Sequence, residues 1–253
     1  MIRAGLLAVL ALAGPGLASA EEIISGLSQS RVAITANFDG SEILLYGAVK
    51  RDAPAPDGPL DVIITVQGPD TPLIIRRKER VAGVWLNKDQ VRIDSAPSFY
   101  AIATTGHLAD ILSETEDLRH NISLRRAIRA IGISAEADRS PEFIEALVRV
   151  RRQSEAYRID EGSVELTAGT LFRTDVVLPA NLTEGEYSVR LFLTRKGRVV
   201  ATQNRVIAVR KEGLERMIFT AAHERPLAYG LVSLALAGLA GWGASAAFRY
   251  LRP

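Results

Sequence analysis

The densest group of chemically capable side chains in this 253-residue sequence is a run of four cations within five residues. The run comprises Arg76, Arg77, Lys78, Glu79 and Arg80. Guanidinium groups pair with oxyanions through parallel hydrogen bonds, so this cluster could bind an anion, a lipid headgroup or an acidic protein surface. The alternative is a solvated hairpin whose charges protect an edge strand. Trp85 alternates with Val81 and Gly83, which predicts a core or interface role for its ring.

The sequence offers little basis for catalysis. Its histidines are isolated from one another, without the spacing of a paired metal site. They are His107, His120 and His223. The acidic cluster of Glu114, Glu116 and Asp117 is more typical of a helix surface than of a general acid and base. Phosphate-binding, dinucleotide-binding and G-x-S-x-G motifs are absent. We therefore expect no catalytic residue, no metal site and no cofactor.

The N-terminal residues have the features of an export signal. Arg3 precedes ten apolar residues, 4–13, and Ala18-Ser19-Ala20 has the A-x-A cleavage pattern. This predicts a signal peptide over residues 1–20 and a mature chain that begins at Glu21. An uncleaved anchor is the alternative, but ten apolar residues are too few to span a bilayer.

A second apolar segment lies near the other end of the sequence. The 23 residues from Pro226 to Phe248 carry no charge, and as a helix they would extend roughly 34 Å, which exceeds a hydrocarbon core of about 30 Å. Arg249 and Arg252 follow, and the positive-inside rule places them in the cytoplasm. We therefore expect a single-pass protein in the bacterial inner membrane, with residues 21–225 exported to the periplasm.

Small residues recur every fourth position along this predicted span. They are Ser233, Ala237, Gly241 and Ser245. A stripe of small side chains lets another helix approach closely, although small residues are also common in any span. The stripe favours a partner in the membrane, either a second copy of the chain or a multi-pass protein, in addition to the lipid bilayer itself.

Charge and cysteine content narrow the function further. The net charge is +2, but without Arg3, Arg249 and Arg252 the exported part has 28 basic and 29 acidic residues. The basicity therefore belongs to the membrane ends and does not support nucleic-acid binding. Cysteine is absent, which excludes disulfides, thiolate metal sites and a cysteine nucleophile.

Hydrophobic periodicity predicts a mainly β protein of immunoglobulin-like sandwich units with a helical insert and one C-terminal transmembrane helix. Strands are expected at 31–36, 42–49, 60–67, 72–78, 81–87, 90–94 and 98–105, and again at 163–168, 171–178, 186–195 and 198–209. Lys196-Gly197 is a two-residue hairpin turn. Tyr187 follows a corner sequence of the kind in which a tyrosine hydroxyl bonds back to the chain. Ser140-Pro141 starts a helix that continues to about Ala156.

These patterns divide the chain into consecutive segments. The expected order is signal peptide 1–20, β-sandwich unit 21–106, helical insert 107–157, second β unit 158–211, interfacial helix 212–224, transmembrane helix 225–248 and cytoplasmic tail 249–253. Whether the two β units share one core is left open by the sequence.

Several landmarks together resemble a known family. The landmarks are Phe38-Asp39-Gly40, Gly68-Pro69, Arg77-Lys78-Glu79-Arg80 with Gly83-Val84-Trp85-Leu86-Asn87, Pro97-Ser98-Phe99-Tyr100, Pro226-Leu227-Ala228-Tyr229-Gly230-Leu231, Gly241-Trp242 and Phe248-Arg249. The combination is similar to the putative transmembrane protein family of alphaproteobacteria over nearly all of the mature chain. The resemblance implies an inner-membrane location and a periplasmic domain, and it supplies no catalytic residues. The family's association with sulfite-exporter-like permeases implies a role as a transporter accessory.

Three hypotheses follow. The first is a non-enzymatic periplasmic interaction module that assists a membrane partner such as a permease. The second is an anion-binding or sensing module at Arg76, Arg77, Lys78 and Arg80. The third and least favoured is an envelope hydrolase.

Overall fold

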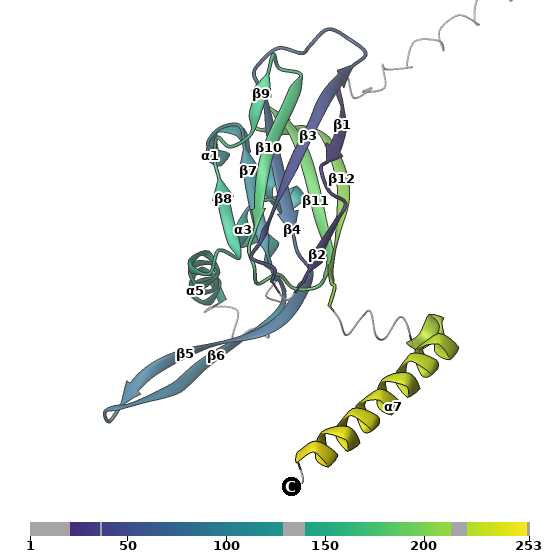
Figure 1. Ribbon diagram of the computed structural model, residues 1–253. Helices are drawn as coiled ribbons and strands as arrows, with labels where there is room; N and C mark the ends of the chain where they lie inside the picture. Colours follow the sequence, from purple (N-terminus) through teal and green to yellow (C-terminus); the bar gives the residue numbers. More distant parts are fainter. Residues whose placement is uncertain (1–20, 36, 129–139, 214–221, 252–253) are drawn as a thin grey trace, which may run out of the picture. The chain divides into compact units, whose positions relative to one another are not determined.

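The computed structural model describes residues 21–35, 37–128, 140–213 and 222–251 (Figure 1). The chain forms two units, one of residues 21–32 and 39–209 and the other of residues 33–38 and 210 onward. The predicted signal peptide, most of the predicted interfacial helix and the last two residues of the predicted tail lie outside the described residues.

The first unit contains two β-sheets that pack face to face (Figure 1). The four-stranded sheet has the order β1-β3-β10-β9. Its strands are β1 (Glu21–Leu27), β3 (Ser41–Arg51), β10 (Leu171–Leu178) and β9 (Glu165–Thr167). The six-stranded sheet has the order β2-β12-β11-β4-β7-β8. Its strands are β2 (Arg31–Ile34), β12 (Arg198–Lys211), β11 (Gly185–Arg195), β4 (Leu60–Gln67), β7 (Tyr100–Thr104) and β8 (Tyr157–Asp160).

The two β segments of the sequence share these sheets. β10 pairs with β3, and β11 pairs with β4, so each sheet contains strands from both β segments of the sequence. The two β units predicted from the sequence therefore share one pair of sheets. The mainly β fold class is confirmed, whereas the immunoglobulin-like assignment stays a prediction.

The helical segment covers the outer face of the six-stranded sheet. It connects β7 to its parallel neighbour β8, as parallel pairing requires a crossover connection. Its helices are α1 (Leu108–Ile111), α2 (Glu114–His120), α3 (Leu124–Ala127) and α5 (Ser140–Gln153). Ile63 of β4 faces this layer, while Val62 and Ile64 point to the opposite side, and all three are fully buried. The three consecutive apolar residues of β4 therefore reflect burial on both faces of the strand.

Two local predictions are confirmed. Lys196 and Gly197 have φ angles of 50° and 74° and join β11 to β12 in a tight turn, since both central residues of a type I′ turn need positive φ. The Tyr187 hydroxyl donates a hydrogen bond to the Thr183 carbonyl oxygen at 2.9 Å.

The region after β4 differs from the prediction. Instead of strands at 72–78, 81–87 and 90–94, a separate two-stranded sheet is formed by β5 (Asp70–Val81) and β6 (Val84–Pro97). Ala82 and Gly83, with φ angles of 49° and 88°, form its turn. The predicted strand 81–87 is therefore wrong, because its alternating residues lie on two sides of a reversal. β1 was not predicted at all.

The second unit contains α7 (Pro226–Leu251). From Pro226 to Ser245 this helix is long and apolar enough to cross a bilayer, by length and composition, and none of that stretch is buried. The predicted C-terminal apolar helix is thus confirmed.

Candidate functional site: a projecting hairpin with one basic face

The predicted cationic cluster lies on the β5–β6 hairpin, whose base is held in the domain core. Val91 and Ile93 of β6 are buried, and Leu73 and Ile75 of β5 pack against the same cluster as Phe143 of α5. The distal half continues beyond this anchor and projects from the sheets (Figure 1). The hairpin is therefore fixed at one end and exposed at the other.

A buried tyrosine further secures the base. The Tyr157 hydroxyl donates a hydrogen bond to the Pro97 carbonyl oxygen, at the end of β6, over 2.8 Å. Burial raises the pKa of the Tyr157 hydroxyl to about 12. The phenol thus remains protonated and able to donate this bond at any physiological pH.

Arg77 separates from the other cations of the cluster. Its guanidinium forms an ion pair with Asp89 on the opposite strand. It also lies 3.5 Å from the Glu142 carboxylate and 5.9 Å from the centre of the Phe143 ring, both on α5. These contacts join the hairpin to α5, so Arg77 has a structural role here.

Arg76, Lys78 and Arg80 lie together on the other face, because alternate residues of a strand share a face. Their cross-strand neighbours are Gln90, Asn87 and Trp85, in that order. Directly opposed residues of an antiparallel pair also share a face. Within the described part of the chain, Arg76 and Lys78 have no acidic partner.

Arg92 extends this face toward the base, opposite Ile74, and its Nε lies 3.9 Å from the Asp94 carboxylate. The basic face therefore consists of Arg76, Lys78, Arg80 and Arg92, with Trp85 at its distal end. Sequence reasoning missed Arg92 because it lies 12 residues beyond Arg80 and joins the group only through the strand register.

The hairpin tip is apolar and exposed. It consists of Val81, Val84, Trp85 and Leu86, whose exposed fractions range from 44% to 65%. Trp85 is the most exposed of the four. The prediction that the Trp85 ring lies in a core is therefore wrong. The alternative, that the ring belongs to an interface, stays a prediction. Large exposed apolar groups on a projecting element are typical of a binding surface.

The histidines occupy separate places. His107 Nδ1 lies 2.9 Å from the Glu161 carboxylate, and this hydrogen bond raises the pKa of His107 above its ordinary value. His120 lies 3.4 Å from Glu116, and His223 belongs to the second unit. Among the described residues, no three His, Asp or Glu side chains gather closely enough to hold a metal ion.

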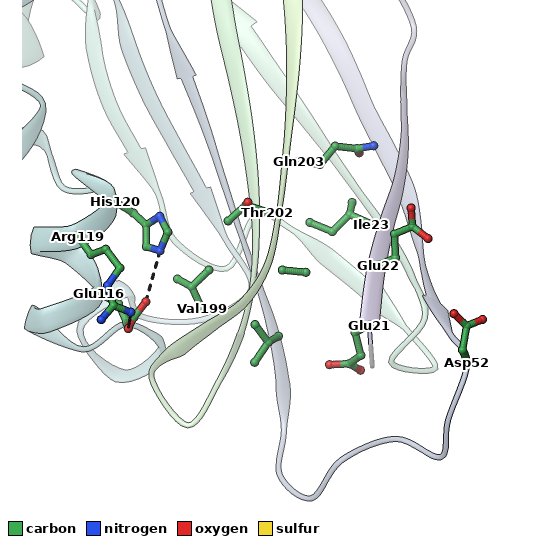
Figure 2. Close-up of a pocket in the computed structure, with 12 residues that line it drawn as sticks. Glu21, Glu22, Ile23, Asp52, Glu116, Arg119, His120, Val199, Thr202 and Gln203 are labelled. Carbon is green, nitrogen blue, oxygen red and sulfur yellow. Dashed lines mark hydrogen bonds and ion pairs between the residues drawn. The ribbon is translucent and has the colours of Figure 1, made fainter. Parts of the chain in front are cut away.

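Glu116 and His120 line a polar cavity of about 600 Å³ (Figure 2). Glu116 is buried, and its carboxylate lies 2.6 Å from Nη1 of Arg119. The prediction that Glu116 belongs to an exposed helix surface is therefore wrong. Glu21, on the other wall, is bound by Arg195. Figure 2 shows the Glu116 and Glu21 carboxylates separated by the β12 segment that carries Val199. The cavity therefore does not combine them as an acid and base.

The predicted small stripe lies on α7. Ser233, Ala237, Gly241 and Ser245 are all exposed, and a Cβ added at Gly241 would meet nothing within 4 Å. The stripe therefore has room for larger side chains within the described structure.

The family model described as "Putative transmembrane protein (Alph_Pro_TM)" matches residues 22–250. The chain belongs to this family. The resemblance inferred from the sequence landmarks is thus confirmed. No curated protein matches the chain.

Two solved structures are similar over 76% of the chain. One is the sporulation control protein Spo0M from Bacillus subtilis, with 13% identity and a TM-score of 0.29, of which the chain covers 50%. The other is BslA, a bacterial hydrophobin, with 11% identity, a TM-score of 0.21 and 97% coverage of that chain. The chain thus spans half the length of Spo0M.

Proposed function

We propose that this member of the transmembrane family is a single-pass inner-membrane protein whose periplasmic β domain is a non-enzymatic interaction module, accessory to a membrane partner such as a permease. The observation that carries the proposal is α7, which is uncharged from Pro226 to Phe248 and presents one face of small residues. An uncharged helix of this length suits a bilayer. A face of small residues suits close contact with another helix.

The proposed orientation follows from the ends of the chain. The signal peptide 1–20 would export the domain, and Arg249 and Arg252 would remain in the cytoplasm. The β domain would then lie in the periplasm.

A binding role agrees with how the polar groups of the domain are used. His107 pairs with Glu161, Glu116 with Arg119, and Glu21 with Arg51 and Arg195. These groups form local structural pairs rather than a convergent acid, base and nucleophile. The hairpin, in contrast, presents cations and apolar side chains outward.

Matched substitutions in α7 test the partner proposal. Successive residues of an α-helix are rotated by about 100°, so Gly243 lies well away from the stripe that contains Gly241. Beyond the helix's own backbone, a Cβ at either glycine meets no atom of the described residues within 4 Å. Gly241→Leu should therefore reduce co-purification of the membrane partner, while Gly243→Leu should not.

The measurement is quantitative crosslinking and affinity purification from mild detergent extracts, with membrane insertion checked by resistance to alkaline extraction. Recovery of monomer alone from the wild type, or equal partner recovery from both variants, would refute the proposal.

A second candidate function is anion binding on the basic face. It is favoured by Arg76 and Lys78, which lack acidic partners among the described residues. Titration of the full chain in detergent with sulfate, sulfite and phosphate should show binding that Arg76→Glu with Lys78→Glu abolishes. Unchanged affinity in that variant would rule out this candidate.

A further inference from the structure

We propose that the distal half of the β5–β6 hairpin inserts into the surface of an anionic lipid bilayer. The apolar tip would enter the interfacial region, while the basic face binds lipid phosphate groups. This inference rests on the proposed function only in taking α7 as the membrane span.

The hairpin leaves the domain at the end that leads to α7. Ser188 of β11 pairs on one side with Gln67, the last residue of β4, and on the other with Val206 of β12. β4 and β12 therefore run in the same direction and finish at the same end of the sheet. β5 begins just after β4, and the chain after β12 reaches α7 through the 14 residues 212–225. The hairpin and the membrane connection thus start from one end of the domain.

The hairpin is long enough to bring its tip into a bilayer surface. From Arg76 to Val81 it extends six residues beyond the buried base, which corresponds to about 20 Å at roughly 3.3 Å per residue. The headgroup layer on one side of a bilayer is about 5 to 8 Å thick. The tip can therefore enter the interface while the sheets remain in water.

The tip has the composition of an interfacial element. Trp85 combines a large apolar ring with an N–H donor, and tryptophan is enriched at membrane–water interfaces. Val81, Val84 and Leu86 surround it with exposed aliphatic surface. A turn that faced only water would gain nothing from four such side chains, whereas the bilayer interface removes them from water.

The charge distribution selects an anionic surface. From Ile74 to the tip, the basic face carries Arg76, Lys78, Arg80 and Arg92, and none of its paired positions is acidic. The acidic residues Glu79 and Asp89 lie at positions of the other face, and Asp94, which pairs with Arg92, lies toward the base of the hairpin rather than near its tip. Arginine and lysine have long apolar stems that lie along acyl chains while the charged ends reach phosphates. The two features together fit lipid better than a free anion, which would leave the apolar tip exposed.

The sequence contains only two tryptophans, Trp85 and Trp242, which makes a direct test possible. In the full-length Trp242→Phe variant, Trp85 is the sole tryptophan reporter. This protein is reconstituted into phosphatidylcholine vesicles with or without phosphatidylglycerol. Its emission and its quenching by lipids with brominated acyl chains are then measured.

The proposal predicts a blue-shifted, strongly quenched Trp85 in vesicles that contain phosphatidylglycerol. Each cation near an anionic surface contributes roughly fivefold in affinity. Replacing Arg76, Lys78 and Arg80 by glutamine should therefore shift the equilibrium away from insertion by on the order of a hundredfold. Circular dichroism of this variant checks that the fold is retained.

A reporter at the other end of the domain controls for simple proximity to the vesicle. Leu171 is exposed and lies on β10 beside Thr170, which contacts Arg51. In a protein lacking Trp85 and Trp242, Leu171→Trp should keep the emission of a water-exposed ring.

An unquenched Trp85 in both lipids would overturn the proposal. So would protection of Trp85 only when a second membrane protein is present, because the tip would then be a protein-binding surface. Alkaline extraction of the same vesicles reports α7 insertion separately. Release of the protein would refute the span, whereas retention with an unquenched Trp85 would refute the hairpin inference alone.

Discussion

The first strand of the domain is predicted to depend on one buried carboxylate. Glu21 lies 2.8 Å and 2.9 Å from two nitrogens of Arg195, and 2.8 Å from Nε of Arg51. The Glu21 and Arg195 side chains are only 3% and 8% exposed. Glu21→Gln removes the charge but nearly preserves the shape, so Arg195 is left buried without its counter-charge.

Breaking a buried ion pair by removing one partner costs about 3 to 5 kcal/mol. Arg195 keeps one further acceptor, the Gly58 carbonyl oxygen, and Arg51 is partly exposed. We therefore expect the free energy of unfolding to fall by about 3 kcal/mol, at the lower end of that range. Urea unfolding of the full chain in detergent, followed by the β-sheet circular dichroism signal, measures the loss.

The neighbouring residue provides the control. Glu22 pairs with Lys50 at 3.3 Å, but both side chains are about half exposed or more. Solvent screens such pairs strongly, so Glu22→Gln should leave unfolding nearly unchanged. Equal stability of the two variants would refute the assigned role of Glu21.

The same site has a defined pH dependence. The hydrogen bond from Arg195 holds the pKa of Glu21 below its ordinary value of 4.5. The stabilisation is therefore fully present above that value and is lost as the pH falls through the lower folded-state pKa. The stability difference between the wild type and Glu21→Gln should shrink over that acidic range. A difference that grows on acidification would contradict the assignment.

Three further outcomes are expected. Tyr187→Phe removes the hydrogen bond to Thr183 and should lower the free energy of unfolding by about 1 kcal/mol in urea titrations; no change would argue against the corner. Glu161→Gln should lower the pKa of His107 toward 6.5, because the Glu161 hydrogen bond is the largest cause of its elevation, and an unaltered histidine titration by NMR would exclude that pairing. Gly197→Ala places a side chain at a φ of 74° and should cost about 1 kcal/mol, so a stability gain in thermal unfolding would contradict the assigned turn.

Elements governed by local chemistry were predictable from the sequence. Lys196-Gly197 requires positive φ at both positions, and the corner before Tyr187 combines a proline, a glycine and a tyrosine at characteristic spacing. The strand expected at 60–67 from hydrophobic periodicity coincides with β4. Local residue preferences therefore located most of the strands.

Features that depend on distant residues could not be predicted. Val81, Gly83 and Trp85 stand at alternate positions, and this period of two concealed the turn at Ala82-Gly83. β1 begins with two glutamates, and only the tertiary partner Arg195 explains why Glu21 is buried. Such pairings are invisible to local periodicity.

The candidate site shows the same limit. The sequence located the cations of the hairpin, but it could not assign them to faces. Arg77 lies on the opposite face from Arg76 and Lys78 because successive side chains of a strand point to opposite faces. It forms ion pairs with Asp89 and Glu142. Arg92 joins the basic face only through the register of the two strands. A cluster in sequence and a cluster in space are therefore different sets of residues.

The central claim is that α7 contacts a membrane partner through its small face. A photoreactive amino acid placed at Ala237 lies on that face, whereas one at Leu239 lies roughly opposite, given about 100° per residue. Both side chains are exposed in the structure. In intact membranes, irradiation should give a discrete adduct from position 237 and little from position 239. Equal adducts from both positions, or none from either, would contradict the account.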